Sequence, residues 1–253
     1  MHPPLGKVGV YHSSFLTELW MNWQSELLQA HVETLYVLDD SGDMCTTNEP
    51  HPPGRRRAPA FHLSWTDWDY VFCFRHDVPV ERRRQVEELV ASQWPFRSSE
   101  EPPEKDRYVE ILGEYCKGRG GAGPAFVVPE GELPTGDATL VTRDNAHILQ
   151  PGFAGWREEV DDVQPFYAVV VDDRAVSTCG TVRRSALGIE AGVDTLEGYR
   201  RRGYARRAVA AWCRAAREEE LIGFYSTSWS NVASRALADR LGLQQFAIEF
   251  SVS

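Results

Sequence analysis

The segment LEGYRRRGYARRAV (residues 196–209) constrains the fold most strongly, because it joins a predicted strand directly to a predicted helix. Residues 190–196 (EAGVDTL) have the character of a short strand, and residues 204–219 carry one apolar stripe at helical spacing. A loop in this position aims the free N–H groups and the positive end of the helix dipole at one point. Gly203 lets the backbone approach a bulky ligand closely. The sequence therefore predicts an anion-binding loop.

Five arginines surround this loop in a chain whose formal net charge is -10. They are Arg200, Arg201, Arg202, Arg206 and Arg207. A mononucleotide P-loop is excluded: Gly198 and Gly203 have its spacing, but Tyr204 and Ala205 replace its lysine and its magnesium ligand. The arginines could also form a nucleic-acid patch or simply a solvated helix start. Cations at a helix N-terminus are unfavourable, so a bound polyanion is the better explanation of their clustering.

The rest of the C-terminal half has a regular order, β-β-β-α-β-α-β. Two β-rich runs flank the hairpin signal Asp172–Asp173–Arg174. The predicted strands are residues 166–171, 175–182, 190–196, 222–227 and 244–252, and the predicted helices are residues 204–219 and 230–241. Ser230 or Asn231 is the expected N-cap of the last helix, and Gly242 ends it.

This pattern resembles the GNAT superfamily of N-acetyltransferases. Arg200-x-x-Gly203-x-Ala205 is similar to the family's pyrophosphate loop, and EAGVDTL is similar to its central strand. The strand IGFYSTSW and the elements Asn231-x-x-Ser234 and LGL (residues 241–243) follow in the family's order. The resemblance covers residues 125–253. It implies an α/β (α+β) fold with a mixed, mostly antiparallel central sheet flanked by helices.

The resemblance implies acetyl-CoA as cosubstrate, with its pyrophosphate in the arginine loop. Val193, Asp194 and Thr195 are expected beside the pantetheine arm, with the Val193 N–H polarising the thioester carbonyl. Asn231 and Ser234 are expected to flank the arm and the sulfur. The expected pyrophosphate site consists of Arg200, Arg201, Arg202, Gly203, Tyr204, Ala205 and Arg206.

The implied reaction is direct attack of an amine on the thioester. Glu190 is the preferred general base, since it shares a strand face with Gly192 and Asp194. An ion pair of Glu190 with Arg183 or Arg184 would give it a purely structural role, and Asp194 is the weaker base candidate. Cys179 is expected to be a buried structural residue, because no histidine or asparagine partner for a nucleophile is recognisable.

The sequence departs from the family at the general acid. The family's tyrosine, four residues before the glycine that ends the last helix, is here Ala238. Ser234, Ser228, Tyr225 or water would then protonate the leaving thiolate. This departure keeps open a second hypothesis, a catalytically degenerate protein that binds CoA as a sensor or scaffold.

Residues 1–124 are predicted to form an additional N-terminal α/β lobe, a candidate cap on the acceptor side, and residues 125–253 the acetyl-CoA-binding domain. Trp20, Trp23, Trp65 and Trp68 belong to the core or line a pocket. The glycine-rich KGRGGAGP (residues 117–124) is predicted to be a flexible connector, because no helix follows it. The other elements predicted in this half are helices at 13–29 and 80–94, strands at 32–38 and 69–74, a loop at 46–59 and a polar break at 98–106.

Composition limits the possible partners. The net negative charge argues against nucleic acid as a partner. No apolar run is long enough to span a bilayer, and the seven histidines suggest no metal cluster. Five cysteines without CxxC spacing favour a reducing compartment, and a cytoplasmic protein is expected. The acceptor is predicted to be a small-molecule or peptide amine, and a homodimer is left open.

Overall fold

The computed structural model describes residues 13–50, 55–96, 100–118 and 120–253, with the side chains of the first helix described from Trp23 onward. The helices are α1 (Ser13–Leu35), α2 (Val80–Gln93), α3 (Lys105–Leu112), α4 (Tyr204–Glu218) and α5 (Val232–Leu241). The strands are β1 (Tyr36–Leu38), β2 (Met44–Thr47), β3 (Phe61–Trp65), β4 (Tyr70–Phe74), β5 (Gly120–Val127), β6 (Thr139–Leu140), β7 (Tyr167–Val171), β8 (Arg174–Arg184), β9 (Gly188–Thr195), β10 (Ile222–Ser226) and β11 (Gln244–Val252). Short 3-10 turns are η2 (Gly113–Tyr115), η3 (Arg143–Leu149), η4 (Ala154–Trp156) and η5 (Glu197–Tyr199).

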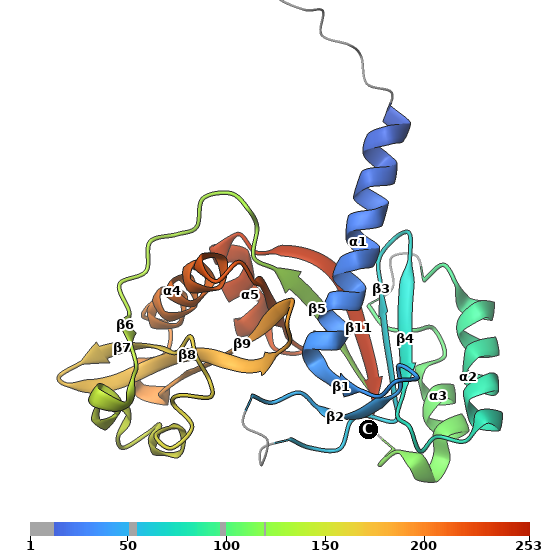
Figure 1. Cartoon of the computed structure of the whole chain (residues 1–253), viewed down its shortest axis with the longest axis horizontal. Helices are drawn as coiled ribbons and strands as arrows, with labels where there is room; N and C mark the ends of the chain where they lie inside the picture. The colour runs from blue at the N-terminus through green and yellow to red at the C-terminus, as the bar shows by residue number, and fades with distance from the viewer. Residues whose placement is uncertain (1–12, 51–54, 97–99, 119) are drawn as a thin grey trace, which may run out of the picture.

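Nine strands of the described residues form one sheet in the order β4-β3-β11-β5-β10-β9-β8-β7-β6 (Figure 1). Its pairs are antiparallel, with the exception of the parallel pair β9 and β10. β1 and β2 form a separate two-stranded ribbon. The mixed, mostly antiparallel sheet flanked by helices is therefore confirmed.

Each face of the sheet carries its own helices. On one face, α4 and α5 pack over β7 to β10 through a core built on Trp212 and Ala238, and α2 and α3 pack over β3, β4 and β11. The other face carries α1, whose Leu27 and Leu28 pack on Phe224. The segment with η3 and η4 lies on that same face against β7 and β8. The two faces explain the alternation of core and polar side chains along the strands.

The C-terminal elements agree with the prediction. The order β7-β8-β9-α4-β10-α5-β11 follows the predicted one, and β11 has the predicted bounds. Asn231 is the N-cap of α5, since its side chain accepts from the Ser234 N–H at 3.1 Å. Gly242 ends the helix with a φ of 69°. These elements carry their signals locally, in periodicity and caps.

The first half departs from the prediction. The strand expected at 32–38 is wrong up to Leu35, because α1 continues to that residue. Leu28, His31 and Val32 are buried at helical spacing, and this burial outweighs the strand preference of the local residues. β3 and α3 were not predicted, β2 occupies the start of the expected loop at 46–59, and α3 begins within the expected polar break.

The connector expected at KGRGGAGP is a strand, β5, over its described residues from Gly120. β5 lies between β10 and β11 and pairs with both. A Cβ at Gly123 would stand 1.8 Å from the carbonyl oxygen of Thr227. The glycine that made this segment look flexible is therefore required by close packing of two backbones.

The division at residues 124 and 125 falls inside β5. β11 pairs with β3 on one side and β5 on the other, so one sheet carries strands from both parts of the chain. The separate N-terminal lobe remains a prediction. Within the described part of the chain, no helix has the length and apolarity needed to cross a membrane.

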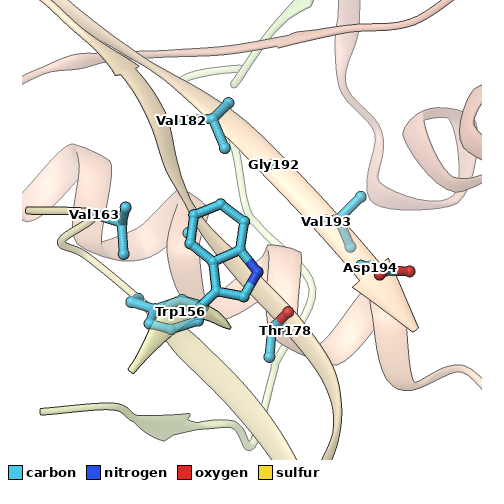
Figure 2. A pocket seen from close by; sticks show the side chains of 9 residues that line it. Trp156, Val163, Thr178, Val182, Gly192, Val193 and Asp194 are labelled. Carbon is cyan, nitrogen blue, oxygen red and sulfur yellow. The ribbon is translucent and has the colours of Figure 1, made fainter. Parts of the chain in front are cut away.

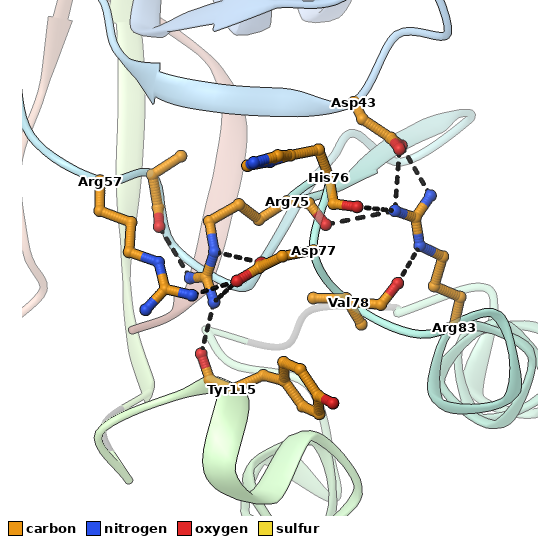
Figure 3. Close-up of polar contacts among 9 residues, drawn as sticks. Asp43, Arg57, Arg75, His76, Asp77, Val78, Arg83 and Tyr115 are labelled. Carbon is orange, nitrogen blue, oxygen red and sulfur yellow. Dashed lines mark hydrogen bonds and ion pairs between the residues drawn. The ribbon is translucent and has the colours of Figure 1, made fainter.

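Two arginines, Arg75 and Arg83, connect N-terminal segments by hydrogen bonds and ion pairs (Figure 3). The buried Arg75 donates to the carbonyl oxygens of Ala58 and Tyr115 at 3.0 and 2.7 Å and pairs with Asp77 at 2.6 Å. Arg83, at the start of α2, makes a two-pronged pair with Asp43 at 2.8 Å. Both guanidinium groups find charged and carbonyl acceptors, which compensates for their removal from water.

Candidate active site

The arginine loop leaves the N-terminus of α4 open. Gly203, the N-cap residue, has a φ of 80° and supplies no side-chain cap. Arg201 has a φ of 62°, in the left-handed region that non-glycine residues rarely adopt. The Arg207 N–H closes the first helical bond to Gly203 at 3.3 Å, so the N–H groups of Tyr204 and Ala205 precede the helical ladder. This backbone is shaped to receive an anion.

The arginines divide into two groups. Arg200 donates from Nε to the Thr195 carbonyl at 3.2 Å, and Arg202 stacks over the Tyr199 ring at 5.5 Å. Arg201 and Arg206 are exposed like them. Arg207 differs from these residues, because it pairs with Asp137 at 2.6 and 2.9 Å. Four arginines therefore remain to attract an anion.

β9 has a free edge beside the loop. Its parallel pairing with β10 ends at Glu190 opposite Phe224, while its pairing with β8 continues to Thr195. The Leu196 N–H donates to Val176 on the β8 side. Because donors alternate along an antiparallel strand, the N–H of Val193 points away from β8, towards the edge that β10 leaves. An extended ligand could pair with this edge.

Glu190 lies where the two parallel strands part, and its residue is 4% exposed. Its Oε1 accepts from the N–H and the hydroxyl of Ser226 at 2.6 and 2.8 Å. Its Oε2 lies 3.1 Å from His31 Nε2. The structural ion pair considered for Glu190 is wrong, since Arg183 pairs with Glu49 and Arg184 with Glu219.

Sequence reasoning missed His31, on α1. Its ring is 1% exposed and lies between Glu190 and Glu249, with Nδ1 3.0 Å from Glu249 Oε1. Burial alone would lower its pKa, but the carboxylates of Glu249 and Glu190 raise the pKa of His31 to about 10. Burial also raises the pKa of Glu249, but the His31 charge outweighs it and holds that pKa below its usual value. A lone histidine near the end of a predicted helix gives no local signal of this partnership.

The residues expected beside the sulfur have two different roles. Asn231 caps α5, and Ser234 lies 2.6 Å from the Tyr225 hydroxyl. Burial raises the pKa of Tyr225 to about 12. Ala238 is fully buried against α4, so nothing at the family's tyrosine position reaches the free edge of β9. Cys179 is likewise fully buried, and burial raises its pKa well above the usual value, as expected of a structural cysteine.

A cavity of about 170 Å³ adjoins β9 on the face opposite α4 (Figure 2). It is lined by Trp156, Val163, Phe166, Thr178, Gly180, Val182, Gly192, Val193 and Asp194. Gly180 and Gly192 face each other across β8 and β9 and leave room for Phe166 and Val182 above them. Of the four tryptophans for which the sequence left core or pocket open, Trp65 is in the core, Trp68 is 61% exposed and Trp23 is at the surface. The Trp20 side chain lies outside the described residues.

Among the residues that the structure describes, no group of three or more His, Cys, Asp or Glu side chains is arranged to hold a metal ion.

Comparison with known proteins assigns the region. Residues 167–249, from β7 into β11, match the family model described as GNAT acetyltransferase. The predicted resemblance of this part of the chain to the GNAT superfamily is confirmed. No curated protein matches the chain.

Three solved structures are similar over different shares of this chain. A GNAT-family protein from Novosphingobium aromaticivorans is 20% identical over 53% of this chain and 64% of its own, with a TM-score of 0.42. A GCN5-related N-acetyltransferase-like protein from Streptococcus suis is 19% identical (58% and 68% coverage, TM-score 0.45). A GNAT-family acetyltransferase from Colwellia psychrerythraea is 12% identical (96% and 98% coverage, TM-score 0.45). All three identities lie below 25% and all three TM-scores below 0.5. The similarity of residues 167–249 to GNAT acetyltransferases therefore rests on the family model.

Proposed function

We propose that the chain transfers an acetyl group from acetyl-CoA to a primary amine by direct attack of the amine. The observation that carries the proposal is the left-handed turn at Arg201 and Gly203, which opens the N-terminus of α4 next to the free edge of β9. Acetyl-CoA combines a pyrophosphate with an extended amide arm. The pyrophosphate needs N–H donors and cations, and the amide arm needs a free strand edge. The site offers the donors and cations in the arginine loop and the free edge in β9.

The chain's own residues divide the binding. The backbone of residues 201–205 would hold the pyrophosphate, with the side chains of Arg200, Arg201, Arg202 and Arg206 around it. Val193, Asp194 and Thr195 would lie along the arm, with the Val193 N–H available to a carbonyl oxygen. Asn231 would reach the arm from the start of α5. When bound, acetyl-CoA supplies the acetyl group as a thioester.

Glu190 would take the proton of the attacking amine. An alkylammonium with a pKa of about 10.4 must give up its proton near neutral pH at a cost of roughly 4.6 kcal/mol, so a base is needed. A carboxylate offers about four acceptor positions. Ser226 takes two positions on Oε1 and His31 takes one on Oε2. One position on Oε2 remains, for the amine or for a water that bridges to it.

Ser234 and Tyr225 would supply a proton to the leaving sulfur. Their hydroxyl oxygens are 2.6 Å apart, so a proton on one is shared with the other. The raised pKa of Tyr225 keeps its phenol protonated at neutral pH. This pair would take the place of the family's tyrosine, which Ala238 cannot provide.

The cavity beside Asp194 is proposed to hold the acceptor. A dry cavity of about 150 Å³ accommodates a benzene ring, so about 170 Å³ admits one ring or a short aliphatic chain. Trp156 and Phe166 offer apolar faces, and the Asp194 carboxylate can attract an ammonium group. The favoured acceptor is therefore a small monoamine with an apolar body.

Calorimetry with acetyl-CoA tests the loop. In Gly203→Glu, the left-handed φ and the added charge should weaken binding by at least about tenfold. Gly198→Glu is the matched control, because it adds the same charge five residues earlier with open space around its Cβ and no left-handed φ. It should bind nearly as tightly as the wild type. Equal weakening in both variants would reduce the effect to net charge and remove the case for the loop.

Steady-state kinetics with benzylamine and with a lysine peptide test the cavity. Trp156→Ala should raise the KM for benzylamine by about tenfold, because an aromatic contact contributes about 1 kcal/mol or more. Trp68→Ala, at an exposed tryptophan outside the cavity lining, is the control and should leave the KM unchanged. A preference for the peptide, with no effect of Trp156→Ala, would rule out the cavity as the acceptor site.

The buried Ala238 also supports a second candidate, a protein that binds CoA without turnover. The same calorimetry separates the two, since acetyl-CoA binding with no acetylation of any amine in a broad panel would establish a sensor or scaffold.

A further inference from the structure

A row of buried polar side chains crosses the sheet on the α1 face. His62 Nε2 lies 3.7 Å from Glu249 Oε1, and His62 Nδ1 lies 3.1 Å from the Tyr36 hydroxyl. These contacts extend the Glu190–His31–Glu249 contacts described above. In order, the row contains Ser226, Glu190, His31, Glu249, His62 and Tyr36. It begins where β9 and β10 part and ends at Tyr36, the first residue of β1.

The two histidines of the row differ in charge. His31 has a carboxylate on each side, at 3.1 and 3.0 Å, which favours the imidazolium form. His62 has the Tyr36 hydroxyl on one side and a more distant carboxylate on the other. Burial lowers the pKa of His62 to about 4, so it is neutral at pH 7. The charged ring of the row, His31, therefore lies between the carboxyl groups of Glu190 and Glu249.

We propose that His31 is a positioning residue for Glu190, holding that carboxylate oriented at the fork of β9 and β10, with Glu249 holding the His31 ring from its other side. This inference rests on the proposed acetyl transfer, in which Glu190 takes the amine proton. It adds a residue from α1, outside the matched region 167–249, to the site.

The geometry favours this role over a simple helix anchor. The apolar contacts of Leu27 and Leu28 already attach α1 to the sheet. His31 instead contacts the one carboxylate at the strand fork, and does so at the oxygen that keeps a free acceptor position. Without His31, Glu190 would be held by Ser226 alone, and no partner would fix the position of its Oε2.

The first experiment needs no activity. Nitrogen NMR of the full chain labelled with ¹⁵N-histidine reports the protonation of each ring nitrogen, and His31→Gln assigns the His31 signals. Both His31 nitrogens should stay protonated from pH 6 to pH 8, and Glu190→Gln should lower the pH at which the ring loses its charge. A neutral His31 at pH 7, or a His31 titration that Glu190→Gln leaves unchanged, would overturn the proposal.

The second experiment is the pH dependence of kcat/KM for acetyl transfer. His31→Gln should lower kcat/KM at pH 7 by at least about tenfold and change the shape of the pH profile, because the imidazolium no longer contacts Glu190. His62→Gln is the matched control, because it replaces another buried histidine of the same row that is neutral at pH 7. The shape of its pH profile should match that of the wild type. Superimposable profiles for His31→Gln and wild type would contradict the proposal.

The two experiments keep the two hypotheses apart. If the wild type acetylates no amine, the proposed function fails, and the NMR result alone decides whether Glu190 and His31 form a charged pair. If the wild type is active and His31→Gln does not fold, substitutions of the other six histidines assign the His31 signals by elimination, and the Glu190→Gln titration of His31 still decides the pairing.

Discussion

Gly123→Ala is expected to lower the free energy of unfolding by about 3 kcal/mol, at the upper end of typical overpacking effects. The added Cβ would stand 1.8 Å from the Thr227 carbonyl oxygen and 2.8 Å from the Ser228 Cα. These are backbone atoms, so no side-chain rotation relieves the clash. β5 pairs with strands on both sides, and the Thr227 N–H donates to Pro124 at 3.2 Å. Any movement of Gly123 therefore disturbs the middle of the sheet.

Urea denaturation of the full chain measures this effect. Gly121→Ala is the matched control: it lies two residues earlier on β5, and a Cβ there meets no atom within 4 Å. Its free energy of unfolding should stay within about 1 kcal/mol of the wild type, since alanine restricts the unfolded chain as much at either position. Equal losses in the two variants would show that the contact with Thr227 does not decide the identity of residue 123.

The stability of the protein is expected to fall by about 3 kcal/mol through His62 as the pH is lowered from 6.5 to 4. His62 is fully buried, and burial lowers its pKa from 6.5 to about 4. Between these values the unfolded chain binds a proton that the folded chain does not, so acid favours unfolding by about 1.4 kcal/mol per pH unit. The charged and titratable groups facing His62 are Glu249, His31 and Tyr36.

The other groups of the row give different pH dependences. His31, with its pKa raised to about 10, contributes stability that is complete below pH 6.5 and is lost as the pH rises towards 10. Glu249, with its pKa lowered, contributes stability above its usual pKa and loses it in stronger acid. The window from pH 4.5 to 6.5 therefore isolates His62 within the row.

Chemical denaturation at several pH values between 4.5 and 6.5 checks the prediction. The free energy of unfolding depends on pH in this window through about one proton bound by His62. His62→Gln should remove this dependence, whatever the variant's absolute stability. Tyr36→Phe keeps the burial of His62 and removes only the hydroxyl contact, so its slope should resemble that of the wild type. An unchanged slope in His62→Gln would mean that His62 is not held neutral in the fold.

Several features of the fold and site could be predicted locally. The arginine loop, the glycine at 203, the cap at Asn231 and the order of the C-terminal elements each carry their signal within a few residues. Periodicity, turn chemistry and helix caps act over such distances. For the same reason Glu190 could be proposed as a base from its strand position alone, while its partners could not be named.

The sequence by itself determined the anion-binding loop and the elements around it, because backbone φ preferences and apolar spacing are local properties. Only the tertiary structure decided that β5 is a strand, because its pairing with β10 and β11 compensates for a glycine-rich composition. It also decided that His31 meets Glu190, 159 residues away in the chain. That contact depends on which helix covers the fork of β9 and β10, and the order of strands in a sheet is set by packing between distant segments.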